Sequence, residues 1–260
     1  MRIGIFYHEE KVERSVVEEL EELFGGQAVA FTEEEQISKV DRLVVLGGDG
    51  AVLRAARRAS EKNIPLVGVN YGTVGFLTEF ERGETAAVAE LVLNENCDTI
   101  KRAMLEVEHA GLRAYCLNEL ALMRRIAPDS VDGVVRIRVN IDGSPAGEFG
   151  ADGLIVSTPT GSTAYSLSAG GSILTPDCEA FLLTPVCAFS MKSRPIICSD
   201  KSELTFTFPE NHAIVLHGDG KFLGEVGKGD LVTVRKSQRS ATFLTKGKND
   251  FFRRLTEKIN

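Results

Sequence analysis

Hydrophobic and polar positions follow two different patterns along this chain, and the change comes near residue 101. Before that point, short apolar runs alternate with stretches of helical spacing. Strands are expected at 2–7, 27–31, 43–46 and 65–69, and helices at 12–24, 50–59 and 85–94. This alternation predicts an α/β domain over residues 1–100, with a parallel sheet that is covered on both faces.

From residue 101 the pattern becomes one of short strands separated by turns. The expected strands are 105–108, 113–116, 119–124, 134–141, 154–157, 193–198, 203–208, 213–217, 222–226 and 231–235. Asp142-Gly143 and Asp219-Gly220 are hairpin signals. A mostly β, sandwich-like domain is therefore predicted over residues 101–240. The segment 241–260 is expected to end in an amphipathic helix, 249–259, that packs back on the first domain.

Composition narrows the class of protein. A formal net charge of −7 argues against nucleic acid as a partner, because domains that bind its backbone are usually basic. No apolar run approaches the ~20 residues of a membrane-spanning helix, so no membrane partner is expected. The cysteines have no CxxC spacing, which predicts reduced, mostly buried thiols in a cytoplasmic protein. They are Cys97, Cys116, Cys178, Cys187 and Cys198.

The most informative stretch is 43–50, where an apolar run ends in Gly47, Gly48 and Gly50 around one carboxylate, Asp49. The glycines lie where a strand leads into a helix, at the edge of a parallel sheet where such folds bind ligands. Backbone amides there can face a phosphate, and the helix dipole favours an anion. A tight turn without function also explains the glycines. Asp49 is the residue that needs a further explanation.

Neither of two familiar nucleotide-binding motifs is present. The chain contains no G-x-x-x-x-G-K-[ST] and no G-x-G-x-x-G, which excludes a P-loop and the dinucleotide-oxidoreductase fingerprint. A glycine loop with an acid but no P-loop lysine suggests phosphoryl transfer of another design. Asp49 would then orient or deprotonate a hydroxyl that attacks a phosphate.

Two polar stretches in the second half suit a nucleoside. The segment 150–171 is rich in hydroxyls, has Asp152 as its charged residue, and offers the Tyr165 ring for stacking. The pair Asn118-Glu119 interrupts an apolar strand pattern and could accept hydrogen bonds from two vicinal ribose hydroxyls. A Ser/Thr-rich loop and a solvated rim pair are the alternative interpretations of these stretches.

Residues 46–50, 70–76, 118–119 and 152–171 together resemble, in order and spacing, the ATP-dependent NAD kinase family in its bacterial form. The resemblance covers residues 2–225, roughly. The Gly-Gly-Asp-Gly loop is shared with diacylglycerol kinases, sphingosine kinases and phosphofructokinases. The segment 158–165, Thr-Pro-Thr-Gly-Ser-Thr-Ala-Tyr, is much more specific to the NAD kinases.

The resemblance implies an α/β N-terminal domain and a β-sandwich domain with NAD bound between them. It also implies homodimers or homotetramers in which a neighbouring subunit completes the NAD site. The implied reaction moves the γ-phosphate of ATP to the 2′-hydroxyl of the adenosine ribose. A divalent metal ion, Mg²⁺, is held mainly by the ATP phosphates.

Individual roles follow by motif match. Asp49 matches the general base, and Gly47, Gly48, Asp49 and Gly50 match the ATP phosphate loop. The matched NAD-binding residues are Asp49, Gly50, Arg54, Phe76, Asn118, Glu119, Asp152, Thr160, Thr163, Ala164, Tyr165, Ser166, Leu167, Ser168 and Cys187.

Some positions depart from the family pattern or keep a second interpretation. Gly150 stands where many members carry a basic residue, and Phe189 stands in place of a common histidine. Cys187 is interpreted more simply as a buried structural thiol. The turn Asp219-Gly220-Lys221 is either near the site or a plain hairpin.

Two other functions stay open at this point. One is a lipid kinase that shares the glycine loop, and the other is a nucleotide sensor without catalysis. A lipid kinase needs an exposed apolar entrance, whereas this chain offers the hydroxyl-rich segment 158–168. An assay of NADP formed from ATP, Mg²⁺ and NAD separates the three functions.

Overall fold

The computed structural model describes residues 1–73, 75–125, 133–211, 213–247 and 251–259. The chain divides into two compact units. Unit 1 holds residues 1–102 and 239–260, and unit 2 holds residues 103–238. None of the described helices is long and apolar enough to cross a membrane.

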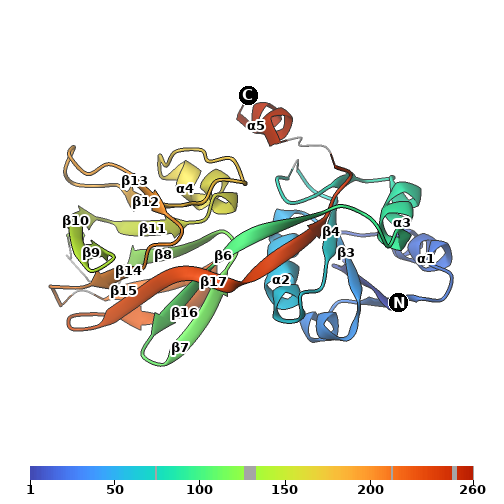
Figure 1. The fold of residues 1–260 in the computed structure, drawn as a ribbon, viewed down its shortest axis with the longest axis horizontal. Helices are drawn as coiled ribbons and strands as arrows, with labels where there is room; N and C mark the ends of the chain where they lie inside the picture. Colours follow the sequence, from blue (N-terminus) through green and yellow to red (C-terminus); the bar gives the residue numbers. More distant parts are fainter. Residues whose placement is uncertain (74, 126–132, 212, 248–250, 260) are drawn as a thin grey trace. The chain divides into compact units, whose positions relative to one another are not determined.

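Unit 1 is built on a parallel sheet in the order β17-β4-β3-β1-β2, with β5 beside β4. Figure 1 shows helices α1 and α3 on one face of this sheet and α2 on the other. The strands are β1 (Ile3–Tyr7), β2 (Ala28–Phe31), β3 (Arg42–Gly47), β4 (Leu66–Asn70), β5 (Phe80–Glu81) and the end of β17 (Leu231–Leu244). The helices are α1 (Arg14–Leu23), α2 (Asp49–Ala59), α3 (Thr85–Leu93) and α5 (Phe251–Ile259).

The central strands of unit 1 are buried on both faces, as expected for a covered parallel sheet. Every residue of β1 and β4 is buried. On one face, Val17 of α1 and Val88 of α3 share a core with Val44 of β3. The order of strands and helices in this unit confirms the predicted α/β class.

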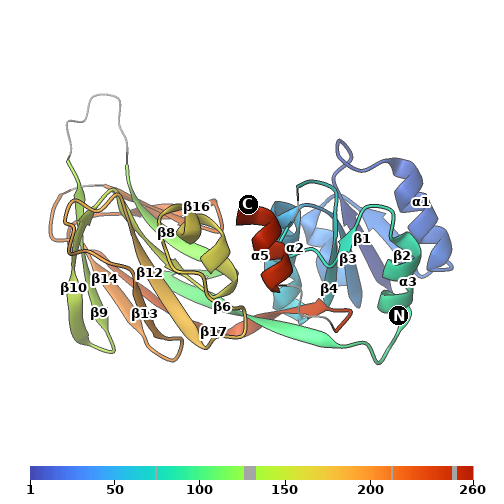
Figure 2. The same cartoon turned by 90° about the horizontal axis from the view of Figure 1, so that it is seen from above.

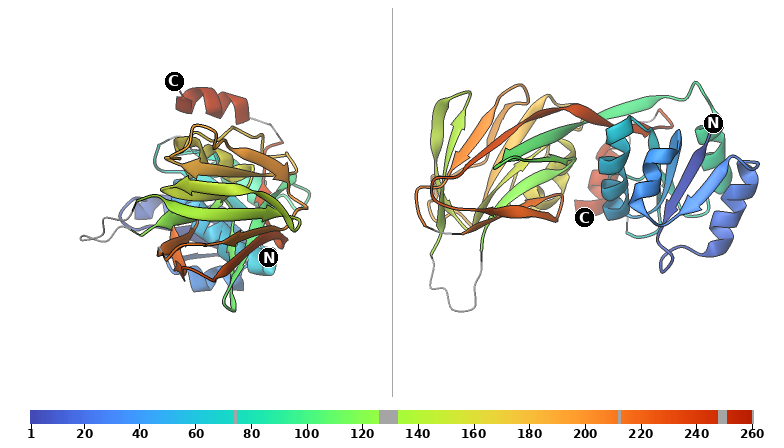
Figure 3. Two further views of the ribbon diagram at one scale, coloured as in Figure 1. Left: turned by 90° about the vertical axis from the view of Figure 1, so that its left-hand side faces the viewer. Right: turned by 90° about the horizontal axis from the view of Figure 1, so that it is seen from below.

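Unit 2 consists of two sheets that share one core, which confirms the mostly β fold (Figures 1 and 3). One sheet runs β10-β9-β14-β17, with β6 against β17 and β7, and the other runs β13-β12-β11-β8-β15-β16. These elements are β6 (Thr99–His109), β7 (Leu112–Cys116), β8 (Glu119–Arg124), β9 (Val135–Ile141), β10 (Ser144–Ala151), β11 (Gly153–Ser157), α4 (Tyr165–Ser168), β12 (Ala180–Val186), β13 (Ile196–Ser199), β14 (Leu204–Thr207), β15 (Ile214–Gly218) and β16 (Lys221–Val226).

Both hairpin signals of the sequence form turns between antiparallel strands. Asp142 and Gly143 have φ values of 51° and 75°, and Asp219 and Gly220 have 49° and 74°. The first pair joins β9 to β10 and the second joins β15 to β16. A φ above zero at both central residues matches the twist of the flanking strands.

Several elements differ from the sequence prediction, among them the short strand β5 and helix α4, which were not expected. Strand β12 was not expected, because its apolar run contains Pro185 and shows no alternation. Strand β17 has 14 residues and continues through the polar stretch 235–240, where the chain passes from unit 2 to unit 1. Figure 2 shows β6 beside this strand. The predicted C-terminal helix begins at Phe251, and residues 249 and 250 lie outside the described ranges.

The prediction of mostly buried thiols is wrong. All the cysteines are free, but Cys116 alone among them is buried, while Cys178 and Cys187 are exposed. The interpretation of Cys187 as a buried structural thiol is wrong for the same reason. Both exposed thiols lie in irregular segments flanking β12 rather than on a core-facing strand position. Cys187 also has a left-handed φ of 47°, which belongs to a turn and not to a strand.

Candidate functional site

In unit 1 the chemistry-bearing carboxylate lies at the start of a helix. Strand β3 ends at Gly47, and α2 begins at Asp49 itself. Asp49 therefore occupies the first helical turn, where a negative side chain interacts favourably with the helix dipole. Its side chain is 33% exposed, so a ligand can reach it.

The loop that follows β4 closes over the Asp49 carboxylate. The Phe76 N–H donates to Oδ2 at 2.9 Å, and the Leu77 N–H donates to Oδ1 at 3.0 Å. Gly75 makes this approach possible, because a Cβ built there would lie 2.2 Å from Asp49 Oδ1. Asp49 thus already anchors a loop, and any chemical role comes in addition to that one. Val74 of the same motif lies outside the described residues.

The C-terminal helix α5 packs against the same loop. The Phe251 ring lies 5.9 Å from the Phe76 ring, measured between centroids. Arg254 donates to the Thr78 carbonyl. Lys258 Nζ lies 3.4 Å from Asp49 Oδ2 and 4.5 Å from the centroid of the Phe76 ring. The helix therefore brings a cation to Asp49 from a distant part of the sequence.

Arg54, predicted as a ligand contact, lies on α2 and interacts with other protein side chains. Its Nε lies 3.9 Å from Glu34 Oε1, and its guanidinium lies 6.0 Å from the centroid of the Phe6 ring. The Arg54 side chain is exposed. Its predicted contact with NAD stays a prediction.

In unit 2 a carboxylate organises the turn that carries Asn118 and Glu119. Asp219 accepts the N–H groups of three successive residues, Leu117 at 2.7 Å, Asn118 at 2.8 Å and Glu119 at 3.1 Å. The Asp219 N–H in turn donates to the Glu119 carbonyl at 3.0 Å. The turn 219–221 is therefore more than a plain hairpin, because it holds the Asn118-Glu119 backbone in one conformation.

Glu119 is a buried acid that lacks a full set of partners. Burial, and then the nearby Asp219 charge, raise the pKa of Glu119 from 4.5 to about 7, against the lowering effect of a hydrogen bond from the Tyr165 backbone. Among the described residues, Glu119 Oε2 and Asn118 Oδ1 are buried acceptors without a hydrogen-bond partner. Unpaired buried acceptors are costly. Two such groups side by side in sequence mark a place where a ligand's donors would be stabilised.

The hydroxyl-rich segment packs onto this turn. The Thr158 hydroxyl donates to the Leu117 carbonyl at 2.6 Å, and the Thr158 N–H donates to the Asn118 carbonyl at 2.9 Å. Gly161 lies so close that a Cβ there would be 2.1 Å from the Asn118 carbonyl oxygen. The structure therefore joins two of the sequence-predicted stretches into one cluster.

Several hydroxyls of this segment serve the protein itself. Ser162 donates to the Pro159 carbonyl, Thr163 donates to the Thr160 carbonyl, and the hydroxyls of Ser166 and Thr184 share a buried hydrogen bond of 2.8 Å. The part of the segment that reaches the surface includes Tyr165, which is 40% exposed, and Ser168. The predicted ligand contacts of Thr160, Thr163, Ala164, Ser166 and Leu167 stay predictions.

Asp152 and Cys187 lie near each other where β11 begins and its partner strand β12 ends. Glu119 pairs with Ser157, at the other end of β11. The Asp152 carboxylate pairs with Arg124 at 3.2 Å, and its N–H donates to the Val186 carbonyl at 2.9 Å. Cys187 follows directly after that strand. Their predicted contacts with NAD stay predictions.

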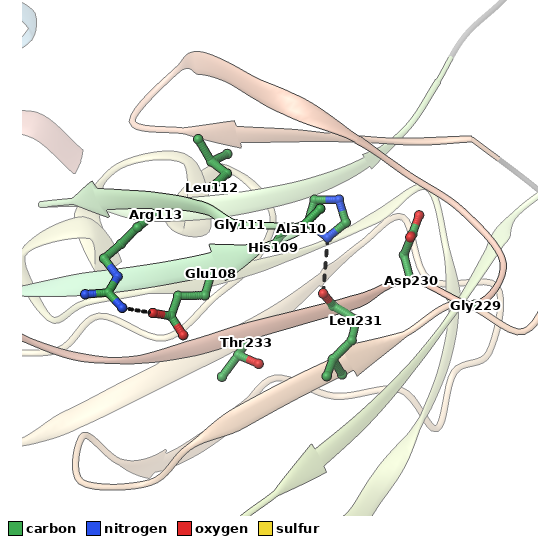
Figure 4. A pocket seen from close by; sticks show the side chains of 10 residues that line it. All are labelled: Glu108, His109, Ala110, Gly111, Leu112, Arg113, Gly229, Asp230, Leu231 and Thr233. Atoms are coloured by element: carbon green, nitrogen blue, oxygen red, sulfur yellow. Dashed lines mark hydrogen bonds and ion pairs between the residues drawn. The ribbon is translucent and has the colours of Figure 1, made fainter.

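A separate hollow of about 560 Å³ in unit 2 contains none of the predicted site residues (Figure 4). It lies between the β6–β7 hairpin and the start of β17, where His109 Nδ1 is 3.1 Å from the Leu231 carbonyl oxygen. An ion pair joins Arg113 to Glu108 at its edge. This hollow is therefore not the candidate site.

The described part of the chain contains no group of three or more His, Cys, Asp or Glu side chains that would hold a metal ion by itself. Magnesium in phosphoryl-transfer sites usually takes one or two carboxylates and is otherwise held by phosphates and water. Such an ion therefore needs no cluster of protein carboxylates, and Asp49 Oδ2 already lies 3.4 Å from the Lys258 ammonium.

Sequence reasoning missed Lys258 and left Asp219 undecided. Lys258 is 209 residues from Asp49, and nothing in an amphipathic helix pattern says which side chain its polar face meets. For Asp219 a signal existed. The Asp219-Gly220 pair marks a tight turn, and an aspartate in such a turn often accepts hydrogen bonds from backbone N–H groups.

The fold and site define a class of protein. It combines an α/β unit carrying a carboxylate at a glycine loop with a β-sandwich unit carrying a buried, under-hydrogen-bonded acid. The family model of the ATP-NAD kinase N-terminal domain matches residues 3–97, and that of the C-terminal domain matches residues 117–246. The chain belongs to the ATP-NAD kinase family.

Individual relatives match most or all of the chain. It is 38% identical over 220 residues to an NAD kinase of Methanothermobacter thermautotrophicus, over 84% of this chain and 76% of the relative. It is 31% identical over 264 residues to an NAD kinase of Fusobacterium nucleatum, over 100% of this chain and 97% of the relative.

Solved structures show the same likeness over the whole chain. A yeast NADH kinase complexed with NADH has a TM-score of 0.88 at 25% identity, covering 100% of this chain and 87% of that chain. An NAD kinase from Archaeoglobus fulgidus in complex with ATP has a TM-score of 0.81 at 26% identity, covering 100% of this chain and 98% of that chain.

Proposed function

We propose that this chain transfers the γ-phosphate of ATP to the 2′-hydroxyl of the adenosine ribose of NAD, giving NADP and ADP. The observation that carries the proposal is the Asp49 carboxylate, held by the N–H groups of Phe76 and Leu77 at the start of α2. A carboxylate in this place repels a bound phosphate. Its presence is therefore best explained by a chemical task. Accepting the proton of an attacking hydroxyl is such a task.

The transfer balances as a single displacement. The 2′-oxygen forms a bond to the γ-phosphorus while the bond from that phosphorus to the bridging oxygen breaks, and ADP leaves with the electron pair. The hydroxyl proton passes to the Asp49 carboxylate and from there to water. Because the transition state is loose, positioning of the hydroxyl matters more than its early ionisation.

NAD is proposed to bind through the polar cluster of unit 2. The unpaired acceptors Asn118 Oδ1 and Glu119 Oε2 suit ribose hydroxyls, which are hydrogen-bond donors. Tyr165 presents an exposed ring for stacking on a base. The glycine loop 47–50, with helix α2 behind it, is proposed to face the phosphates of ATP.

A divalent cation, Mg²⁺, is proposed to accompany ATP and to be held mainly by its phosphates. When bound it neutralises charge on the β- and γ-phosphates. Because all five cysteines are free, which suits a reducing compartment, we place the protein in the cytoplasm.

We also propose that the chain works as a homodimer or homotetramer in which a neighbouring subunit completes the NAD site. Two large apolar side chains on the loop after β12, Phe189 and Met191, are 84% and 85% exposed. Neighbouring exposed apolar side chains on one loop favour burial against another protein surface. A second copy of this chain is the proposed occupant.

The deciding experiment incubates the purified chain with ATP, Mg²⁺ and NAD and measures NADP with an NADP-specific dehydrogenase. NADP formation that stops on addition of EDTA and returns with excess Mg²⁺ is expected. Tight NAD binding without NADP would favour the sensor instead. Phosphorylation of diacylglycerol or sphingosine, in place of NAD, would favour a lipid kinase and contradict the proposal.

A further inference from the structure

Asp49 is held from two directions by groups far apart in sequence. The loop after β4 supplies two N–H donors, one to each carboxylate oxygen. Helix α5 supplies the Lys258 ammonium, 3.4 Å from Oδ2. The carboxylate therefore has three restraints, and the charged one comes from the last helix of the chain.

The Lys258 ammonium makes a second contact besides Asp49. It lies 4.5 Å from the centroid of the Phe76 ring, within the range of a cation–π contact. The Phe76 ring also packs against Phe251 at the start of α5, and Phe76 supplies the N–H bound to Oδ2. Helix, aromatic ring and carboxylate thus form one cluster, which couples the position of α5 to the orientation of Asp49.

Both side chains of this ion pair are only partly exposed. Lys258 is 35% exposed and Asp49 is 33% exposed, so a ligand can still reach the pair. Partly buried pairs are screened less than exposed ones. A long lysine restrained by a ring also loses less conformational freedom when it pairs.

We propose that Lys258 is a positioning residue for phosphoryl transfer, acting through Asp49. It holds the carboxylate in the orientation in which that group takes the proton of the attacking hydroxyl. The inference rests on the proposed NAD kinase activity and adds to it a role for the C-terminal helix. Lys258 itself transfers no proton and contacts no reacting atom in this role.

The test is a double-mutant cycle on kcat. Lys258→Met keeps the unbranched stem over Phe76 and removes the charge. It should lower kcat by ~10- to 100-fold, because small displacements of a catalytic group cost about that much, and change the KM for NAD by less than about threefold. Lys258→Arg, which keeps the charge, should restore most of kcat. In an Asp49→Asn background the same Lys258→Met change should alter the residual rate less than about twofold.

Arg253→Met is the matched control, because Arg253 lies on the same helix and pairs with Glu257 at 2.8 Å instead of with Asp49. It should leave kcat within about twofold of the parent. Equal losses from Lys258→Met in both backgrounds, or a loss that Lys258→Arg does not relieve, would show a structural role and overturn the proposal. So would full activity of Lys258→Met. A parent chain that forms no NADP would instead overturn the proposed function itself.

Discussion

At the scale of single residues, the carboxylates of Asp49 and Glu119, proposed for catalysis and for NAD binding, have opposite surroundings. Asp49 accepts two backbone N–H groups and pairs with Lys258, so its negative charge is compensated. Glu119 is buried beside the Asp219 charge and has an oxygen without a partner. The first arrangement suits a group that must be held in one orientation. The second suits a group that accepts hydrogen bonds from a ligand.

Asp49→Asn should lower kcat by roughly 10²- to 10⁴-fold, the usual contribution of general-base help. NAD affinity should change little, since Asn118 and Glu119 keep their proposed contacts with the ribose. The asparagine keeps one oxygen acceptor for the loop and loses the other, so thermal unfolding should be recorded beside the kinetics. Steady-state rates and calorimetric NAD binding decide the matter, and a parallel loss of binding and turnover contradicts the base role.

Glu119 should make NAD binding depend on pH near neutrality. Because the pKa of Glu119 is raised to about 7, the carboxylate is mostly ionised at pH 8 and mostly protonated at pH 6. The protonated acid accepts fewer hydrogen bonds, so NAD affinity should fall by up to about tenfold from pH 8 to pH 6. In Glu119→Gln the affinity should be weak at both values. Titrations that show no pH dependence in the parent chain would exclude this role.

The stability of Glu119→Gln provides a control, because the substitution should weaken NAD binding but stabilise the fold at high pH. A carboxyl whose pKa is raised on folding stabilises the folded state fully below its ordinary value of 4.5 and progressively less as pH rises toward 7. Glu119→Gln removes that loss. The free energy of unfolding of the variant minus that of the parent should therefore be roughly 1–3 kcal/mol larger at pH 8 than at pH 4.5. Urea denaturation of both proteins at the two pH values measures this difference.

At the scale of elements, both candidate clusters depend on a glycine that lets two segments meet. Gly75 lies against Asp49, and Gly161 lies against the Asn118 carbonyl. Neither glycine has a φ in the left-handed region, so space rather than backbone conformation explains them. A glycine in a loop is usually explained by the backbone conformation that a turn requires. Here the partner that requires it lies in another element of the same unit.

Gly75→Ala should lower kcat strongly without unfolding the chain. The new methyl group would lie 2.2 Å from Asp49 Oδ1, which forces the carboxylate or the loop to move. Gly72→Ala is the matched control in the same loop, because its nearest neighbour, Asn70 Oδ1, would be 3.9 Å away. We expect a loss of at least about 10-fold for Gly75→Ala and near-parent rates for Gly72→Ala. Equal rates for the two variants would show that the loop adapts and that the close approach is unimportant.

At the scale of the whole molecule, the chain passes between its two units twice, within β6 and within β17. Each proposed working carboxylate belongs to a different unit, Asp49 to unit 1 and Glu119 to unit 2. Return of residues 239–260 to unit 1 is what brings α5 and Lys258 to the glycine loop. Helix α5 is therefore part of the proposed active centre.

The proposed assembly of copies is tested by mass in solution. Phe189→Ser combined with Met191→Ser should convert the homo-oligomer to smaller species, as measured by light scattering coupled to gel filtration, because burial of these apolar side chains is lost. Phe222→Ser, at another exposed aromatic that is 57% accessible, is the control and should keep the parent mass. A monomeric parent chain would contradict the assembly outright, and an unchanged mass of the double variant would exclude this loop as the interface.

The sequence by itself determined the fold class, most strands and helices, both hairpin turns and the family. Hydrophobic periodicity and turn residues are local signals, and they are read from neighbours along the chain. The Gly-Gly-Asp-Gly loop and the Asn118-Glu119 pair were likewise recognisable, since each is contiguous. Strand β12 and the full length of β17 were missed, because pairing with neighbouring strands overrode a weak local pattern.

Only the tertiary structure decided which groups surround the two carboxylates. Lys258 meets Asp49 across 209 residues of sequence, and Asp219 binds the N–H groups of residues 117–119 across about 100. It also decided that Cys187 is exposed and that most hydroxyls named from segment 158–168 bond within the protein. Burial, charge and hydrogen-bond partners depend on distance in space, which no local pattern encodes. The residues that give each carboxylate its properties are therefore a product of the fold.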